Sequence, residues 1–256
     1  PVIHEAFSVA KIDKSEVNAI AFTRGPGLMG PLLVGVSFAK GFALANCIPL
    51  IEINHMQAHI LAHFIDDPKP EFPFVCLTVS GGHTQLVLVK DHLEMEILGQ
   101  TLDDAVGEAF DKGAKLLGLE YPGGPLIDKY ASEGHPEKFD FPISDIDDLN
   151  YSFSGIKTAL LYFIQKNSQK NPNFVRENLS DICASYQKIL IDTLMQKLDR
   201  AVDKYDLKSI AIAGGVSANR GLRQRVEQYG CEKSLKVFIP KFEYCTDNAA
   251  MIGKAA

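Results

Sequence analysis

Tryptophan is absent from this 256-residue sequence, and its five cysteines show no CxxC spacing. An odd number of cysteines without paired spacing argues against both a disulfide framework and a zinc knuckle, so we expect buried, reduced thiols. Hydrophobic residues make up 46% and charged residues 23% of the chain, which excludes a disordered or collagen-like protein. The length suits one large domain or two small ones.

Long uncharged apolar runs are also missing. The longest candidate, 30–50, contains Lys40 and several glycines, and we interpret it as a buried helix rather than a membrane span. The first residues show no basic segment followed by an apolar core, the pattern of a signal peptide. We therefore expect a cytoplasmic protein that does not enter a membrane.

Basic charge is scarce. The net charge is −6, and residues 1–130 carry 9 basic against 16 acidic side chains, while the rest carries 17 and 16. Charge alone therefore does not indicate a nucleic-acid-binding protein. A polyanionic ligand would need a partner protein or a local basic patch.

The first quarter of the chain alternates strand and helix patterns. Strands are predicted at 19–23 and 48–53, and helices at 31–47 and 54–64, the latter capped by Asn54. Because strand and helix alternate, we expect parallel strand pairing with right-handed crossovers.

A proline-rich linker at 66–73 separates this part from a second pattern. A hairpin is predicted from strands 74–79 and 84–89 around Gly81-Gly82. The remaining predicted elements are strands at 94–99 and 209–213, a turn at 121–125, and helices at 103–117, 154–166, 174–202 and 219–228. The whole pattern predicts two α/β lobes with a cleft between them.

The sharpest local motif is the histidine pair in NHMQAH at 54–59. On a helix, His55 and His59 lie on one face about 6 Å apart at Cβ, which suits one divalent ion. The zinc-protease signature requires Glu directly after the first histidine, and Met56 stands there instead. A solvated or core histidine pair is the alternative, and a third ligand has to come from elsewhere.

Two glycine turns are candidate anion sites. In the turn at 80–84, Gly81 and Gly82 allow backbone N–H groups to approach an anion without interference from Cβ. The segment AGGVSAN at 213–219 runs from a strand to a helix N-terminus, where N–H groups and the helix dipole favour negative charge. Neither turn is a GxGxxG or Walker motif, and each alone could be an ordinary turn.

Carboxylates gather on the predicted helix at 103–117. Three of them, Asp104, Glu108 and Asp111, would share one face and could bind a metal or ribose hydroxyls. A solvated helix face is the commoner explanation for such a pattern. Asp247, taken alone, is a helix N-cap.

Taken together, these features resemble the actin, sugar-kinase and heat-shock-chaperone superfamily (the ASKHA fold). Within it the sequence is similar to the bacterial TsaD branch of the tRNA N6-adenosine threonylcarbamoyltransferases. The motifs that carry the resemblance are NHMQAH (54–59), TVSGGHTQL (78–86), LDDAVGEAFDKGAKLLGLEYPGGP (102–125), YSFSGIKTAL (151–160), AGGVSANRGLR (213–223) and CTDNAAMIG (245–253).

The resemblance implies an acyltransferase. Family members transfer threonylcarbamoyl from threonylcarbamoyl-AMP to N6 of adenosine 37 in tRNAs that read ANN codons, and AMP leaves. The implied ligands of a divalent metal, Fe2+ or Zn2+, are His55, His59 and Asp247. The implied substrate-binding residues are Thr78, Val79, Ser80, Gly81, Gly82, Asp111, Gly124, Asp128 and Asn219. His83 lies beside them and could relay a proton.

Compared with the family pattern, the chain begins partway through the first lobe, so we expect that lobe to be incomplete. The expected lobes are 1–68 with 248–256, and 69–247. ATP could bind the same cleft. The implied partners are tRNA, a TsaB-like paralogue and a TsaE-like ATPase, the paralogue contacting helices 31–47 and 56–64.

Two other functions remain open. The first is a metal-dependent glycoprotein endopeptidase (O-sialoglycoprotein endopeptidase), an older label of this family, which the missing Glu after His55 disfavours. The second is a non-catalytic ATP-binding scaffold, which would have no need of the His55, His59 and Asp247 set. The local basic candidates for tRNA contact are Arg220, Arg223, Arg225, Lys166 and Lys170, with solvated helix faces as the alternative.

Overall fold

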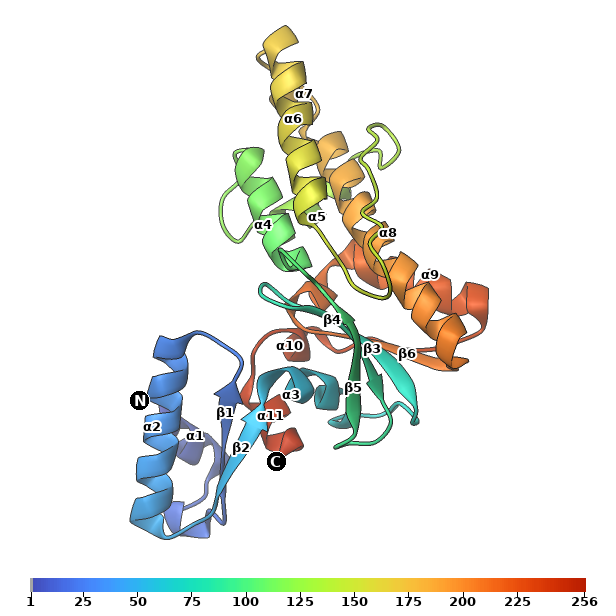
Figure 1. The fold of residues 1–256 in the computed structure, drawn as a ribbon. Coiled ribbons are helices and arrows are strands. Elements are labelled where there is room, and N and C mark those ends of the chain that lie inside the picture. The colour runs from blue at the N-terminus through green and yellow to red at the C-terminus, as the bar shows by residue number, and fades with distance from the viewer. Residues whose placement is uncertain (1) are drawn as a thin grey trace. The chain divides into compact units, whose positions relative to one another are not determined.

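The computed structural model describes residues 2–256, which form two compact units. The first unit comprises the chain up to Ile65 together with Asn248–Ala256, and the second comprises Asp66–Asp247. Figure 1 shows the course of the chain through both units. The C-terminal segment therefore returns to the unit in which the chain begins.

The first unit is built around a two-stranded parallel sheet of β1 (Ile20–Gly25) and β2 (Leu50–Asn54). Helix α2 (Met29–Asn46) connects the two strands, and this confirms the predicted strand–helix–strand order. The other elements of the unit are α1 (Val2–Ala10), the 3-10 helix η1 (Lys14–Glu16), α3 (His55–Leu61), the 3-10 helix η2 (Ala62–Phe64) and α11 (Ala249–Ala255).

Helix α2 corrects one prediction, because it is exposed rather than buried. Of its 18 residues only Ala39 and Ala43 are buried, whereas Leu33, Val34 and Leu44 are 62%, 73% and 81% exposed. The sheet beneath it is only two strands wide and covers a single side of the helix. By length and composition alone α2 could cross a membrane, which is weak evidence, since core helices and signal sequences meet the same criterion.

The second unit contains a five-stranded sheet in the order β5-β4-β3-β6-β7. The strands are β3 (Phe74–Val79), β4 (Thr84–Val89), β5 (Met95–Gln100), β6 (Ser209–Ala213) and β7 (Lys236–Phe238). The predicted hairpin is confirmed, with β3 and β4 paired antiparallel from Phe74–Val89 to Val79–Thr84. Strand β6 lies beside β3 in parallel, so two sequence-distant strands end at the same edge of the sheet.

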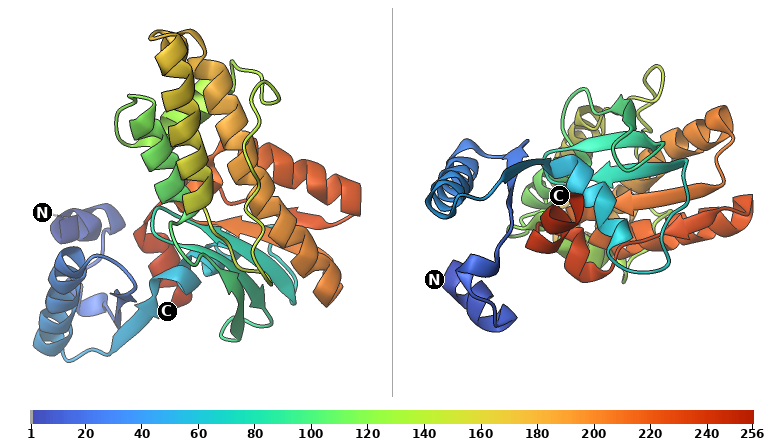
Figure 2. Two further views of the ribbon diagram at one scale, coloured as in Figure 1. Left: turned by 45° about the horizontal axis from the view of Figure 1, so that its top comes forward. Right: turned by 90° about the horizontal axis from the view of Figure 1, so that it is seen from below.

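Helices make up the rest of this unit; some pack on the sheet and others project away from it (Figure 2). They are α4 (Val106–Leu116), α5 (Gly123–Ala131), α6 (Ser154–Lys170), α7 (Phe174–Glu177), α8 (Leu179–Tyr205), η3 (Gly215–Ala218), α9 (Arg220–Lys233) and α10 (Phe242–Cys245). The core between sheet and helices includes fully buried Tyr151, Tyr186 and Phe153. Tyr186 donates its hydroxyl hydrogen to the Ala109 carbonyl over 2.9 Å, which satisfies a phenol that burial would otherwise penalise.

Four further predictions were wrong in detail. Helix α5 begins at Gly123, inside the segment predicted as a turn. The helix predicted at 174–202 is interrupted at Asn178, and Asp103 and Asp104 precede α4 rather than belong to it. Among the cysteines, Cys47 and Cys231 are exposed, while the other three are buried, and all five are free.

A buried lysine holds the irregular segment that precedes Tyr151 by binding Asp145 and Asp148 in it. Lys197 of α8 is fully buried and donates to Asp145 Oδ1 over 3.1 Å and to the Asp148 carbonyl over 3.0 Å. Arg200 donates to the other Asp145 oxygen over 2.9 Å. Hydrogen bonds from Arg200 and Lys197 lower the pKa of Asp145 to about 2, so its carboxylate remains charged down to strongly acidic pH.

We expect Asp145→Asn to destabilise the protein near neutral pH, because it leaves the buried Lys197 without a countercharge. The pKa of Asp145 is lowered by folding, so its contribution is complete above the ordinary value of 3.8 and is lost as pH falls through about 2. Urea unfolding of both proteins at several pH values measures this difference. The control is Asp203→Asn, which removes an exposed ion pair with Lys233. The prediction is contradicted if the free energies of unfolding of wild type and Asp145→Asn differ by the same amount at every pH.

Candidate active site and metal centre

The turn between β3 and β4 faces open space. The backbone N–H of Ser80 donates to the His83 carbonyl over 2.8 Å, and the His83 N–H donates to Ser80 Oγ over 3.0 Å, which closes a tight turn. A Cβ atom added at Gly81 or Gly82 would meet no heavy atom within 4 Å. Packing therefore does not demand glycine at these positions, and the space in front of their backbone is available to a ligand.

Helix α4 begins directly against this turn. A Cβ at Gly107 would lie 2.5 Å from the Ser80 carbonyl oxygen, so only glycine permits the approach. The Val106 N–H at the start of the helix donates to Thr84 Oγ1 over 2.9 Å. These contacts place the next turn of α4, with Phe110 and Asp111, beside the glycine turn.

The end of β6 supplies the opposite wall. Gly214 has φ +87°, and a Cβ there would lie 2.4 Å from the Val79 carbonyl oxygen, so the chain can leave the sheet here only through glycine. The 3-10 helix η3 follows, and Asn219 then caps α9 by accepting a hydrogen bond from the Leu222 N–H over 2.8 Å.

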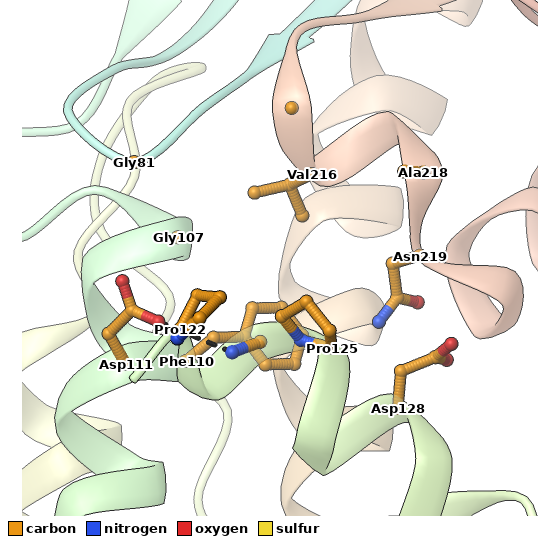
Figure 3. Close-up of a pocket in the computed structure, with 12 residues that line it drawn as sticks. Gly81, Gly107, Phe110, Asp111, Pro122, Pro125, Asp128, Val216, Ala218 and Asn219 are labelled. Atoms are coloured by element: carbon orange, nitrogen blue, oxygen red, sulfur yellow. Dashed lines mark hydrogen bonds between the residues drawn. The ribbon is translucent and has the colours of Figure 1, made fainter. Parts of the chain in front are cut away.

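These segments enclose a cavity of about 280 Å³ within the second unit. Figure 3 shows side chains from α4, α5 and the segment after β6 converging on it. The lining residues are Gly81, Gly107, Phe110, Asp111, Pro122, Gly124, Pro125, Asp128, Gly215, Val216, Ala218 and Asn219. Apolar walls with a few polar groups are typical of small-ligand sites.

The polar groups of the cavity are held by protein partners. Asp111 Oδ1 accepts hydrogen bonds from the N–H groups of Gly123 and Gly124 over 2.8 and 3.2 Å, and so caps α5 from a neighbouring helix. Asp128 accepts a hydrogen bond from Arg220 Nε over 2.8 Å. The Asn219 amide donates to Gln187 Oε1 over 2.7 Å. Their positions are therefore fixed before any ligand arrives.

The structure brings five of the predicted substrate-binding residues together at this cavity, namely Gly81, Asp111, Gly124, Asp128 and Asn219. Thr78 and Val79 are instead fully buried in β3, and Thr78 Oγ1 contacts Cys76 Sγ. Ser80, Gly82 and His83 belong to the adjoining turn but do not line the cavity. Reasoning from single motifs missed the apolar wall of Phe110, Pro122, Pro125 and Val216, since nothing in those residue types marks a site.

The predicted face of three carboxylates does not exist. Asp104 pairs with Lys112 over 2.8 Å and with Lys157 over 3.2 Å, whereas Glu108 pairs with Lys112 alone. Asp111 of the same group points to α5, as described above. The prediction failed because Asp104 lies before the first turn of α4.

The first unit carries the histidine pair at the start of α3. Asn54 caps this helix by accepting hydrogen bonds from the N–H groups of Met56 and Gln57 over 2.9 and 3.1 Å, as expected from the sequence. The rings of His55 and His59 lie edge to face with centroids 4.8 Å apart. His59 is only 2% exposed.

Asp247 completes a group that can hold a metal ion. It is joined to Asn248, which caps α11 by accepting a hydrogen bond from the Met251 N–H over 2.9 Å, and α11 packs against α3. The ligand atoms of His55, His59 and Asp247 all lie within 4.8 Å of one another. Imidazole and carboxylate groups are the ligand types of divalent transition metals, and a shift of a few tenths of an ångström would bring these atoms to bonding distance of one ion, about 2.0–2.2 Å.

Three arginines predicted to contact tRNA form ion pairs or hydrogen bonds with other residues of the second unit. Arg220 pairs with Asp128, and Arg225 with Glu232 over 3.3 Å. Arg223 donates to the carbonyls of Ser217 and Pro240 over 2.8 and 2.7 Å, and its guanidinium stacks 4.0 Å above the Phe242 ring. It therefore ties the glycine turn after β6 to α10, the helix that precedes Asp247.

The fold and these sites define a mixed α/β protein with a small-ligand cavity and a candidate metal centre. Two solved structures of HypF share the fold: one, full-length and bound to phosphate and nucleotide, has a TM-score of 0.69 at 14% identity, and the other, from T. kodakarensis, 0.68 at 13%. Each match covers 99% of this chain, which spans 40% and 42% of those chains. At this identity the likeness shows the fold alone, and it confirms the predicted fold class.

Sequence comparison identifies the family. The family model described as TsaD, tRNA N6-adenosine threonylcarbamoyltransferase, matches residues 1–254. Curated relatives of that description include those of Cytophaga hutchinsonii, 62% identical, and Christiangramia forsetii, 61% identical. Both matches cover 100% of this chain, and they cover 74% and 76% of the relatives. The chain belongs to this family of transferases, as the motifs predicted.

Proposed function

We propose that this protein transfers threonylcarbamoyl from threonylcarbamoyl-AMP to N6 of adenosine 37 in tRNAs that read ANN codons. The observation that carries the proposal is a family match across residues 1–254 of a chain that also contains a nucleoside-sized cavity and a His, His, Asp group. In the reaction the adenosine N6 forms a bond to the carbamoyl carbon, N6 loses a proton, and the bond to the phosphate oxygen breaks so that AMP leaves.

The cavity suits the adenylate part of the donor. A Cβ added at Gly81 or Gly82 would meet open space, so a phosphate can approach this turn; its backbone N–H groups would then hold the phosphate, which makes AMP a better leaving group. Asp111, Gly124 and Asp128 would lie along the ribose, and Asn219 near the adenine. Because adenosine N6 is a weak nucleophile, fixing both substrates in line provides most of the rate acceleration.

Ser80 and His83 would act from the same turn. Their mutual hydrogen bonds hold the turn closed, and a closed turn would keep its backbone N–H groups in place for the phosphate. Thr78 and Val79 are buried in β3, so they would contribute backbone position rather than side-chain contacts. His83 would accept the proton that leaves N6, since an imidazole changes protonation near neutral pH.

His55, His59 and Asp247 would hold one divalent ion, Fe2+ or Zn2+. When bound, such an ion supplies a Lewis acid for oxygens of the threonylcarbamoyl group. ATP would compete for the same cavity. The two lobes of the enzyme would be 1–68 with 248–256, and 69–247.

The proposed partners are a TsaB-like paralogue and a TsaE-like ATPase, in the cytoplasm. The exposed apolar face of α2 supports a paralogue contact in the first unit, since large exposed apolar areas mark protein interfaces. Leu61 and Phe64, which the sequence also suggested for this contact, are each only 6% exposed.

Transfer of labelled threonylcarbamoyl from its adenylate to tRNA, with native protein, both partners and added metal, tests the proposal. We expect label in tRNA that carries adenosine 37 and none in a matched tRNA with guanosine there. Absence of label from both tRNAs, or cleavage of a glycoprotein substrate by the same preparation, contradicts it.

A further inference from the structure

Helix α6 presents a basic face in an otherwise acidic protein. Its 17 residues include three lysines, Lys157, Lys166 and Lys170, and no Asp or Glu, although the chain as a whole has a net charge of −6. Lys166 and Lys170 lie one turn apart and are both exposed. Neither forms an ion pair with any described residue, so their charges remain available to an anion.

An exposed aromatic ring lies on the same face. Tyr162 is 64% exposed, with exposed Thr158 one turn before it and Lys166 one turn after it. Residues four apart are neighbours on a helix, so these side chains form a continuous row. Aromatic rings set among lysines are characteristic of RNA-binding surfaces, where they stack on bases while the lysines contact phosphates.

The basic face continues across a groove onto α4. Helices α4 and α6 lie side by side (Figure 1), and a groove of about 440 Å³ between them is lined by Lys112, Lys115, Leu116, Lys157, Thr158 and Leu161. Asp104 pairs with Lys112 and Lys157, and Glu108 also pairs with Lys112, so the two carboxylates together balance these two lysines. Lys115 forms no ion pair within the described part of the chain.

This groove starts next to the candidate active site. Helix α4 places Phe110 and Asp111 at the cavity, and Lys115 follows one turn later, about 6 Å along the helix axis. A tRNA whose adenosine 37 reaches the carbamoyl group of an adenylate bound in the cavity would therefore have its neighbouring backbone within reach of the groove. The basic face from Lys157 to Lys170 then extends about 20 Å along α6.

We propose that the α4–α6 surface, defined here as Lys115, Tyr162, Lys166 and Lys170, is the docking site for the phosphate backbone of the tRNA substrate. The inference rests on the proposed function for the identity of the polyanion. The arginines of α9 are a poorer choice, because Arg220 and Arg225 are engaged by Asp128 and Glu232. We favour RNA over an acidic protein as the ligand of this surface. RNA offers phosphates to the unpaired lysines and bases that can stack on Tyr162, whereas an acidic protein would leave Tyr162 without a stacking partner.

The test is a triple variant, Lys115→Gln, Lys166→Gln and Lys170→Gln, in the reconstituted enzyme with its partners. Its matched control is Lys14→Gln, Lys204→Gln and Lys254→Gln, exposed lysines elsewhere with the same total change in charge. We expect the dissociation constant for tRNA to rise at least about tenfold. The slope of log affinity against log salt should fall by about 2–3, or 0.7–0.9 for each lost phosphate contact.

Catalysis once tRNA is bound should be unchanged. The triple variant should keep wild-type kcat at saturating tRNA and wild-type KM for the adenylate, since none of its residues lines the cavity. Tyr162→Ala should weaken tRNA binding about five- to tenfold, and Tyr162→Phe, which keeps the ring, should restore it.

Three results would overturn the proposal: tRNA affinity unchanged in the triple variant, equal weakening in the control variant, or loss of partner-protein binding with tRNA binding intact. The last would assign the surface to an acidic protein. Direct tRNA binding, measured by fluorescence anisotropy, is independent of the transfer reaction. A wild-type protein that binds tRNA through this surface but transfers nothing would contradict the proposed function and leave the docking site standing.

Discussion

Replacing both His55 and His59 by alanine is expected to abolish binding of a divalent metal and to lower threonylcarbamoyl transfer at least about 100-fold. The two imidazoles provide two of the three ligand groups that lie within 4.8 Å of one another, and Asp247 alone cannot hold a transition metal against water. Metal content by mass spectrometry and transfer to tRNA measure the two effects separately.

The control for this variant is His4→Ala with His92→Ala, two histidines outside the group. It should keep both metal and activity. Because His59 is buried, its loss also removes packing, so thermal unfolding of all proteins after chelation separates metal loss from misfolding. Full activity in the His55, His59 variant would remove the metal from the mechanism, and retained metal would place the centre elsewhere.

A second large effect is expected from Gly214→Ala, which should lower the free energy of unfolding by about 3 kcal/mol or more. At φ +87° and ψ 170° the backbone is in a region that essentially only glycine adopts. The new Cβ would also lie 2.4 Å from the Val79 carbonyl oxygen, and that strand cannot shift without disturbing its pairing with β4.

The neighbouring glycine is the matched control. A Cβ at Gly215 meets no heavy atom within 4 Å, so Gly215→Ala should change stability by less than about 1 kcal/mol. Gly215 lines the cavity, however, so the added methyl group should raise KM for the adenylate. Urea unfolding and steady-state kinetics of both variants measure the two effects, and equal loss of stability in the two variants would contradict the prediction.

Local patterns predicted many elements correctly because their signals are short-range. Asn54 caps α3 as predicted, and the helix predicted from residue 219 begins where the Asn219 side chain caps α9, since a cap depends on a side chain reaching an N–H group two or three residues away. The β3–β4 hairpin was likewise predictable, because two apolar strands flank a two-residue glycine turn.

Predictions failed where distant residues decide the outcome. Helix α2 has the composition of a buried helix, yet exposure depends on how wide a sheet lies beneath it. The carboxylates near the start of α4 do not form one site. Asp104 and Glu108 share Lys112, whereas Asp111 turns to the N–H groups of α5. Arg223 looked like a surface cation, but α10 and the carbonyl groups around it enclose its guanidinium.

By itself, the sequence determined the family, the order of strands and helices, and the residue types available for metal and phosphate binding. Those properties follow from motifs, periodicity and short-range hydrogen bonds, which a linear chain displays directly. Tertiary structure decided which of those residues meet. The cavity joins Gly81, Asp111 and Asn219 because β3 and β6, more than 130 residues apart in the chain, end at the same edge of the sheet. A contact over that separation depends on the packing of everything between, which no local pattern encodes.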